Sequence, residues 1–117
     1  MESNFVNVVG VLPVTDHAEA VTWYQKWIGR GPDVKPMDGV AEWQLAEKAW
    51  IQVAVNPEAA GGSTVVVGVV DVAKQCSDCA AAGVEVVEVN DYGFIKLAEA
   101  VDPAGNKIIF VQEVQQA

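Results

Sequence analysis

The chain has 117 residues, 51% of them hydrophobic, and its 16 acidic side chains against 7 basic ones give a net charge of -9. This length and composition predict one domain with a substantial core, and the acidic balance argues against a nucleic-acid partner, whose phosphates select a basic face. No apolar run approaches the roughly 20 residues of a membrane span and the start lacks a secretory signal pattern, so we expect a cytoplasmic chain with no membrane partner.

The first half of the chain reads as a strand, a helix and further strands. Asp16, or Thr15 as the alternative, is a good N-cap, and Glu19 completes the spacing of a capping box. Gly29 can take the left-handed conformation that ends a helix, and Pro36 confines the segment around it to a sheet edge. The expected elements are a strand at 5–14, a helix at 16–28, a short edge strand at 34–37, and strands at 40–45 and 49–55.

The second half repeats this pattern after a connector at 57–63 that contains proline and glycine. Asp71 is expected to cap a second helix, Gly83 to end it, and residues 102–106 to form a strong turn. The expected elements are strands at 64–70, 84–89, 94–101 and 107–114, a helix at 72–82 and a frayed tail at 115–117. The sequence therefore predicts an α/β (α+β) fold of two β-α-β-β-β modules, about 1–56 and 64–117, whose sheets form a cupped surface.

Residues with reactive side chains are few. Cys76 and Cys79 have a CxxC spacing, but the single histidine, His17, lies far from them, and both cysteines fall inside a predicted helix. We interpret the cysteines as buried structural residues and His17 as an exposed residue at a helix start. Four further side chains could reach a cleft rim without a spacing that pairs them, and we name no catalytic residue: Glu42, Tyr92, Glu99 and Glu113.

Two motifs stand out, one on the first helix and one on the last turn. The first reads Leu12-Pro13-Val14-x-Asp16…Ala20…Trp23-Tyr24…Ile28-Gly29, and the second reads Asp102-Pro103-Ala104-Gly105-Asn106. Together they resemble the vicinal oxygen chelate superfamily, the group of glyoxalases, bleomycin-resistance proteins and extradiol dioxygenases. The resemblance covers nearly the whole chain. It implies the two-module fold and, as in many members, a pair of chains that share each cleft.

Enzymes of that superfamily hold a divalent metal on side chains from four strands of the cup. The resemblance places the corresponding positions at Val9, Gln52, Val65 and Ile109. Valine and isoleucine have no lone pair, whereas a hard divalent cation needs three or more oxygen or nitrogen ligands. The sequence departs from the metal pattern, and we expect no metal and no other cofactor.

Positions two residues away along the same strands are also expected to face the cup. Trp50 is favoured as a cleft residue, while Trp43 either flanks the ligand or lies buried under the first helix. The apolar residues of this set would equally well fill a core or a dimer seam. The expected lining is Asn7, Val9, Val11, Trp43, Trp50, Gln52, Ala54, Val65, Val67, Lys107, Ile109 and Val111.

Apolar walls with a few orienting polar groups are typical of small-molecule pockets. We therefore expect metal-independent binding of a small, largely apolar or aromatic molecule at a homodimer interface, resembling drug sequestration by the bleomycin-resistance branch. The acidic surface would suit a cationic drug. Two alternatives stay open: a lyase, isomerase or thiol transferase with a non-standard site, and a non-catalytic interaction module with a filled cup.

Overall fold

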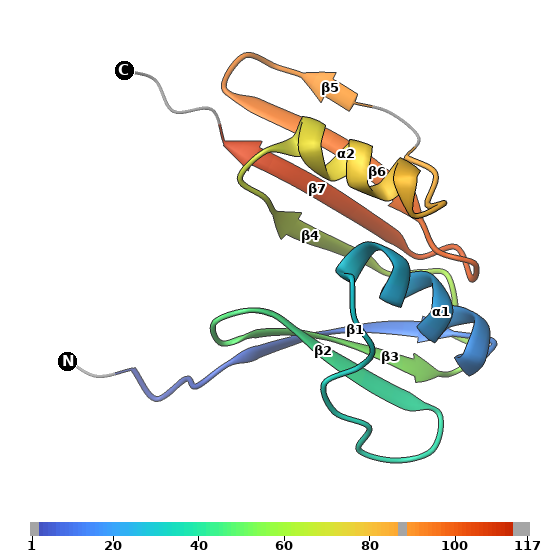
Figure 1. Ribbon diagram of the computed structural model, residues 1–117. Coiled ribbons are helices and arrows are strands. Elements are labelled where there is room, and N and C mark those ends of the chain that lie inside the picture. The colour runs from blue at the N-terminus through green and yellow to red at the C-terminus, as the bar shows by residue number, and fades with distance from the viewer. Residues whose placement is uncertain (1–2, 87–88, 114–117) are drawn as a thin grey trace.

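The computed structural model describes residues 3–86 and 89–113, which form two modules, each with a helix and its own sheet (Figure 1). The mixed fold predicted from the sequence is confirmed. No helix of this described part is long and apolar enough to cross a membrane. The elements are β1 (Val8–Val14), α1 (His17–Ile28), β2 (Val40–Ala46), β3 (Ala49–Val55), β4 (Thr64–Gly68), α2 (Val72–Ala81), β5 (Val89–Asp91), β6 (Ile95–Val101) and β7 (Lys107–Glu113).

Each sheet combines one parallel pair with antiparallel neighbours. The first sheet has the order β1-β3-β2, with β1 parallel to β3 and β2 antiparallel to it. The second has the order β4-β7-β6-β5, with β4 parallel to β7. Because β1 and β4 each pair on one side only, the first strand of each module is a sheet edge.

The helix boundaries follow the predicted caps. The Asp16 side chain accepts a hydrogen bond from the Glu19 N–H at 2.9 Å, and Gly29 ends α1 with φ 92°. Asp71 caps α2 in the same way through the Lys74 N–H at 3.1 Å. A carboxylate at these positions satisfies a free N–H of the first helical turn, which is why both helices begin where the sequence indicates.

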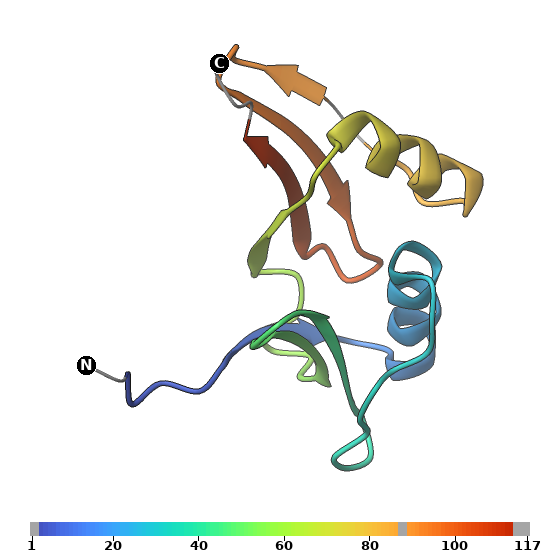
Figure 2. The same cartoon turned by 60° about the vertical axis from the view of Figure 1, so that its left-hand side comes forward.

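Helix α1 joins the two modules through aromatic side chains. Tyr24 is fully buried, and its ring centre lies 5.9 Å from that of Trp43 in the first sheet. The Trp27 ring packs edge to face against the ring of Phe110 in the second sheet, with 5.3 Å between the ring centres. Both helices lie on the same side of the molecule (Figure 2). The core therefore runs continuously from one sheet to the other along α1.

The turn at 102–106 also holds the modules together, through a buried carboxylate. Oδ2 of Asp102 accepts a hydrogen bond from the Tyr24 hydroxyl at 2.7 Å and another from the side-chain amide of Asn106 at 2.9 Å. Oδ1 of Asp102 accepts hydrogen bonds from three backbone N–H groups of its own turn. Asn106 in turn donates to the Pro13 carbonyl at 2.6 Å. A motif of the second module is thus bonded to both the helix and the first strand of the first module.

Several predicted strands are shorter than expected, each for a local reason. The first begins at Val8 rather than at residue 5, because Val8 is already opposite Ala49, the first residue of β3. The segment 34–37 makes only an isolated bridge from Val34 to Glu42. In the segment 84–89, the N–H of Val84 bonds to the Cys79 carbonyl at 2.8 Å, so this residue extends the helix end and not a sheet. Residues 87–88 and 114–117, which include the predicted tail, lie outside the described part.

Candidate functional site

Each sheet has an inner face, which packs on the helices, and an outer face. In the first sheet, Leu12, Ile51 and Val53 are fully or almost fully buried on the inner face. Side chains alternate along a strand, so the residues between them lie on the outer face. These include the predicted cup residues Val9, Val11, Trp50, Gln52 and Ala54, of which Val9 and Val11 are 39% and 49% exposed.

The outer face of the second sheet carries Lys107, Ile109 and Val111, since Ile108 and Phe110 are fully buried on its inner face. Ile109 is in register with Val66 of β4 and with Glu99 of β6. Val66 is 63% exposed. The predicted positions on β7 therefore share the outer face of the second sheet, together with Val66.

The prediction that Val65 and Val67 face the cup is wrong. Both lie on the inner face, partly buried and packed against the core, and Val66 takes the outer position. The prediction counted back from Asp71, but β4 ends at Gly68, and residues 69–70 are not in a strand. One residue of difference moves every side chain of a strand to the opposite face.

The prediction that Trp43 binds ligand is also wrong. Trp43 is opposite Ile51 in the β2–β3 pair and shares its inner face, while Gln44 lies opposite Trp50 on the outer face. The Trp43 ring is fully buried, and its Nε1 donates to the Arg30 carbonyl at 3.0 Å. Trp43 is therefore buried under the first helix, which was the alternative that the sequence left open. The predicted site residue Asn7 is exposed in the segment that precedes β1.

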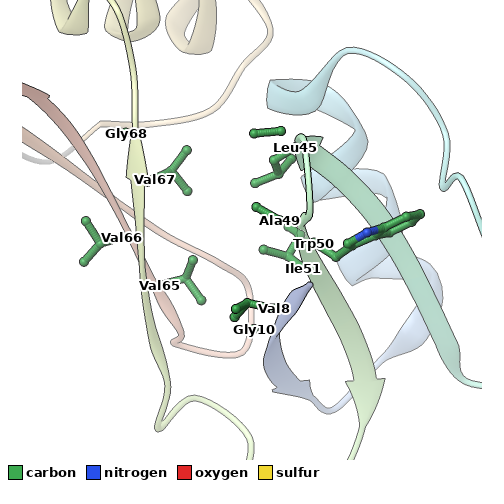
Figure 3. Close-up of a pocket in the computed structure, with 11 residues that line it drawn as sticks. Val8, Gly10, Leu45, Ala49, Trp50, Ile51, Val65, Val66, Val67 and Gly68 are labelled. Atoms are coloured by element: carbon green, nitrogen blue, oxygen red, sulfur yellow. The ribbon is translucent and has the colours of Figure 1, made fainter. Parts of the chain in front are cut away.

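The outer faces of the two sheets point in opposite directions within one chain. In Figure 3 the Trp50 and Val66 side chains extend away from each other, with the inner faces of the two sheets between them. A cup that includes both faces is therefore not closed by a single chain. The predicted residues that do lie on outer faces are neighbours within each sheet, but one chain does not bring the two faces together.

A cavity of about 260 Å³ lies between the inner faces, where β4 passes the first sheet. Its walls are mostly apolar, and they include Val65 and Val67, the two valines that were predicted to lie on the outer face. β1 and β4 approach closely here, since a Cβ added to Gly10 would lie 3.4 Å from Cγ2 of Val65. The lining is Val8, Gly10, Leu45, Ala46, Ala49, Trp50, Ile51, Val65, Val66, Val67 and Gly68 (Figure 3). Among the lining side chains, only Trp50 carries a polar group, its indole N–H.

Two polar pairs interrupt the outer faces. On the first sheet, Nε2 of Gln52 donates to Oε2 of Glu42 at 2.6 Å. On the second, Nζ of Lys107 lies 3.7 Å from Oε1 of Glu99. Sequence reasoning named Glu42 only as one of several rim residues, because its pairing with Gln52 depends on the register of β2 on β3.

The residues at the superfamily's metal positions do not fit a divalent metal. Of the expected positions Val9, Gln52, Val65 and Ile109, only Gln52 has a donor atom, and its amide is engaged with Glu42. Val66, which takes the outer position in place of Val65, has no donor atom either. Within residues 3–86 and 89–113, no group of three or more His, Cys, Asp or Glu side chains is arranged to hold a metal ion.

The histidine and the two cysteines named from the sequence lie on the helices, away from both outer faces. His17 is the first residue of α1, and its Nδ1 is buried without a hydrogen-bond partner in the described part of the chain. Cys79 is fully buried in α2 and Cys76 partly so, and burial raises the pKa of both thiols. A raised pKa leaves little thiolate at neutral pH, which is opposite to what a reactive cysteine needs.

Comparison with known proteins finds the same fold in several solved structures. A glyoxalase/bleomycin resistance protein from Catenulispora acidiphila is 27% identical, with a TM-score of 0.88 over 93% of this chain and 99% of that one. TnmS3, an antibiotic binding protein from a Streptomyces species, is 19% identical, with a TM-score of 0.78 over 92% of this chain and 95% of that one. A bleomycin-binding protein complexed with bleomycin is 16% identical, with a TM-score of 0.73 over 92% and 98% of the two chains.

No family model matches the sequence, and no curated protein matches it either. The structural matches nevertheless extend over nearly the whole length of both partners, so they include both modules and the order of all their elements. The resemblance first seen in the α1 and turn motifs is thereby confirmed. The chain has the fold of the vicinal oxygen chelate superfamily, that of the glyoxalase and bleomycin resistance proteins.

Proposed function

We propose that two copies of this chain pair and bind a small, largely apolar or aromatic molecule in cups formed between them, without a metal. In each cup, the outer face of the first sheet of one chain is opposed by the outer face of the second sheet of its partner. The protein would act by sequestering its ligand, in the manner of a drug-binding resistance protein, and we place this activity in the cytoplasm as the composition predicts.

The observation that carries the proposal is the opposite orientation of the two outer faces. Val9 and Val11 on one face and Val66 on the other are 39%, 49% and 63% exposed. Exposed apolar patches on a folded chain mark surfaces that bind a partner or a ligand. A second copy related by a two-fold axis would cover both patches at once, because such an interface uses the same pair of surfaces twice.

The solved relatives supply independent support. One is described as an antibiotic binding protein and another as a bleomycin-binding protein in complex with bleomycin. A cup floored by valines, with Trp50 as its large aromatic side chain, suits the same kind of ligand. A planar ring stacked on Trp50 would gain about 0.5–1.5 kcal/mol beyond the area that it buries.

A mixing experiment tests whether each cup is shared. One variant carries Trp50→Ala on its first sheet, and the other carries Ile109→Asp on its second sheet. Each variant alone has only defective cups, so both should bind the probe 2-naphthalenemethanol weakly. After the two are unfolded and refolded together, half of the dimers are mixed, and each mixed dimer has one cup with both faces intact. Calorimetry should then show tight sites in about a quarter of the cups.

Sedimentation of each variant and of the wild type provides the control, since all three must be dimers for the comparison to hold. Absence of recovered binding in the mixture would show that sites are not shared between chains. A wild-type chain that binds the probe while it sediments as a monomer would contradict the proposal as well.

A further inference from the structure

The polar pair on the first sheet lies in the middle of an otherwise apolar row. Strand register places Val11, Gln52 and Glu42 side by side across β1, β3 and β2, and the bridge from Glu42 to Val34 extends the row by one residue. Both flanking residues are valines, 49% and 41% exposed. The backbone of Glu42 is bonded to Val34 through both of its polar groups, since its N–H donates to the Val34 carbonyl at 2.8 Å and its carbonyl accepts the Val34 N–H at 3.2 Å. The carboxylate is therefore a fixed feature of the cup floor.

The hydrogen bond within the pair determines which ligand groups it can accept. Nε2 of Gln52 donates to Oε2 of Glu42 at 2.6 Å, which engages the amide's donor side. The groups left over are two acceptors, the amide oxygen of Gln52 and the second carboxylate oxygen of Glu42, and one donor, the second N–H of the Gln52 amide. This part of the floor is thus complementary to a hydrogen-bond donor and would repel a carboxylate.

Among the described residues, Glu42 also has no cationic partner. The salt bridges within residues 3–86 and 89–113 join Arg30 to Asp33, Lys74 to Asp78 and Lys107 to Glu99, and none includes Glu42. Glu99 on the outer face of the second sheet thus has an internal counter-ion, whereas Glu42 on the first does not. A carboxylate on an apolar floor gains most from a cation that arrives with the ligand.

Trp50 sets the distance at which that cation would lie from the ligand's ring. It is on the same face of β3 as Gln52 and two residues before it, about 7 Å along the strand. A ring stacked on Trp50 would therefore place a basic group near Glu42 if the two are joined by one to three atoms. The net charge of -9 would further favour the approach of such a molecule.

We infer that Glu42, held by Gln52, is the cation-recognition point of the cup, and that its ligands are planar aromatic molecules with a protonated amine or amidine on a short side chain. This inference rests on the proposed binding function and adds to it the charge and the donor character of the ligand.

Three probes of similar size test the inference: the cationic 2-naphthylmethylamine, the neutral 2-naphthalenemethanol and the anionic 2-naphthoate. The wild-type protein should bind the amine about ten-fold more tightly than the alcohol, and the carboxylate most weakly, by calorimetry at low salt. Glu42→Gln keeps the size and polarity of the side chain but removes its charge. The preference for the amine over the alcohol should then fall to within about two-fold, because the cationic amine loses more affinity than the neutral alcohol when the carboxylate charge is removed.

Glu47→Gln is the matched control, because it makes the same change of charge in the β2–β3 turn, outside the outer face. This variant should keep the full preference, and circular dichroism checks that both variants are folded. Equal affinity of the wild type for amine and alcohol, or a preference that survives in Glu42→Gln, would overturn the inference and leave the binding function standing. If none of the three probes binds, the proposed function itself fails, and this inference fails with it.

Discussion

Replacing Tyr24 by phenylalanine removes one hydroxyl from the network that joins the two modules. The hydroxyl donates to Asp102 at 2.7 Å, both residues are buried, and no other atom of the ring changes. The same Asp102 oxygen keeps a hydrogen bond from the Asn106 amide at 2.9 Å. The substitution therefore tests a single interaction between residues that are far apart in the sequence.

The expected cost is set by the charge of the acceptor and by its burial. A hydrogen bond to a charged group contributes about 1.5–3 kcal/mol, more than the roughly 1 kcal/mol of a neutral pair, and a buried acceptor that loses a donor is not rehydrated. Asp102 keeps its other hydrogen-bond donors in the variant, so the decrease in the free energy of unfolding should be smaller than for a buried charge with no partner. We expect Tyr24→Phe to lower the free energy of unfolding by about 2 kcal/mol.

Urea denaturation at one fixed protein concentration measures this change, since the stability of a dimer depends on concentration. Tyr92→Phe is the matched control, because its ring is 57% exposed and the same loss of a hydroxyl should cost less than about 0.5 kcal/mol. Equal midpoints for Tyr24→Phe and Tyr92→Phe would refute the view that the Tyr24–Asp102 bond holds the modules together.

We expect the effect of Tyr24→Phe on stability to depend on pH. Burial, and then the hydrogen bond to Asp102, raise the pKa of the Tyr24 phenol above its ordinary value. Its contribution to stability is therefore complete below the unfolded phenol's pKa of about 10 and is lost as the pH rises above it. The difference in unfolding free energy between wild type and Tyr24→Phe should shrink by about 1.4 kcal/mol per pH unit in that range. A difference that is constant from neutral to high pH would contradict this reasoning.

Three further predictions concern the core, a turn and a thiol. Trp43→Ala should lower the free energy of unfolding by about 3–5 kcal/mol, because it leaves a cavity where a fully buried ring was. Trp50→Ala should weaken the binding of 2-naphthalenemethanol far more than it lowers the free energy of unfolding. Equal losses of stability in the two variants would place Trp50 in the core. Gly61→Ala should cost about 2–4 kcal/mol in urea denaturation, because φ is 84° and the new Cβ would collide with a backbone carbonyl oxygen. Gly29→Ala has a similar φ but open space around the Cβ, so about 1 kcal/mol is expected, and similar costs at both glycines would argue against the collision. Cys79 is fully buried with a raised thiol pKa, so a maleimide should label it only as fast as the chain unfolds, and rapid labelling of the native protein would contradict its burial.

Local patterns predicted the elements well and the ends of strands less well. Asp16 and Gly29 bound α1 as expected, because capping depends on side chains within one turn of the helix. Residues 84–86 are not part of the strand predicted at 84–89, since the N–H of Val84 bonds to the end of α2. An apolar run alone does not distinguish a strand from a segment that packs below a helix end.

The sequence by itself determined the two-module order, the helix caps, the turn before the last strand and the largely apolar character of the strand positions that were expected to line a cup. Each of these depends on residues close together in the chain. Only the tertiary structure decided which face of each strand is outer, that Val66 and not Val65 is opposite Ile109, and that Trp43 is buried while Trp50 is not. Alternation tells which residues share a face but not which way that face points, because one residue more or less in a loop reverses it. The opposite orientation of the outer faces and the bond between Glu42 and Gln52 arise from contacts between strands, which no local pattern encodes.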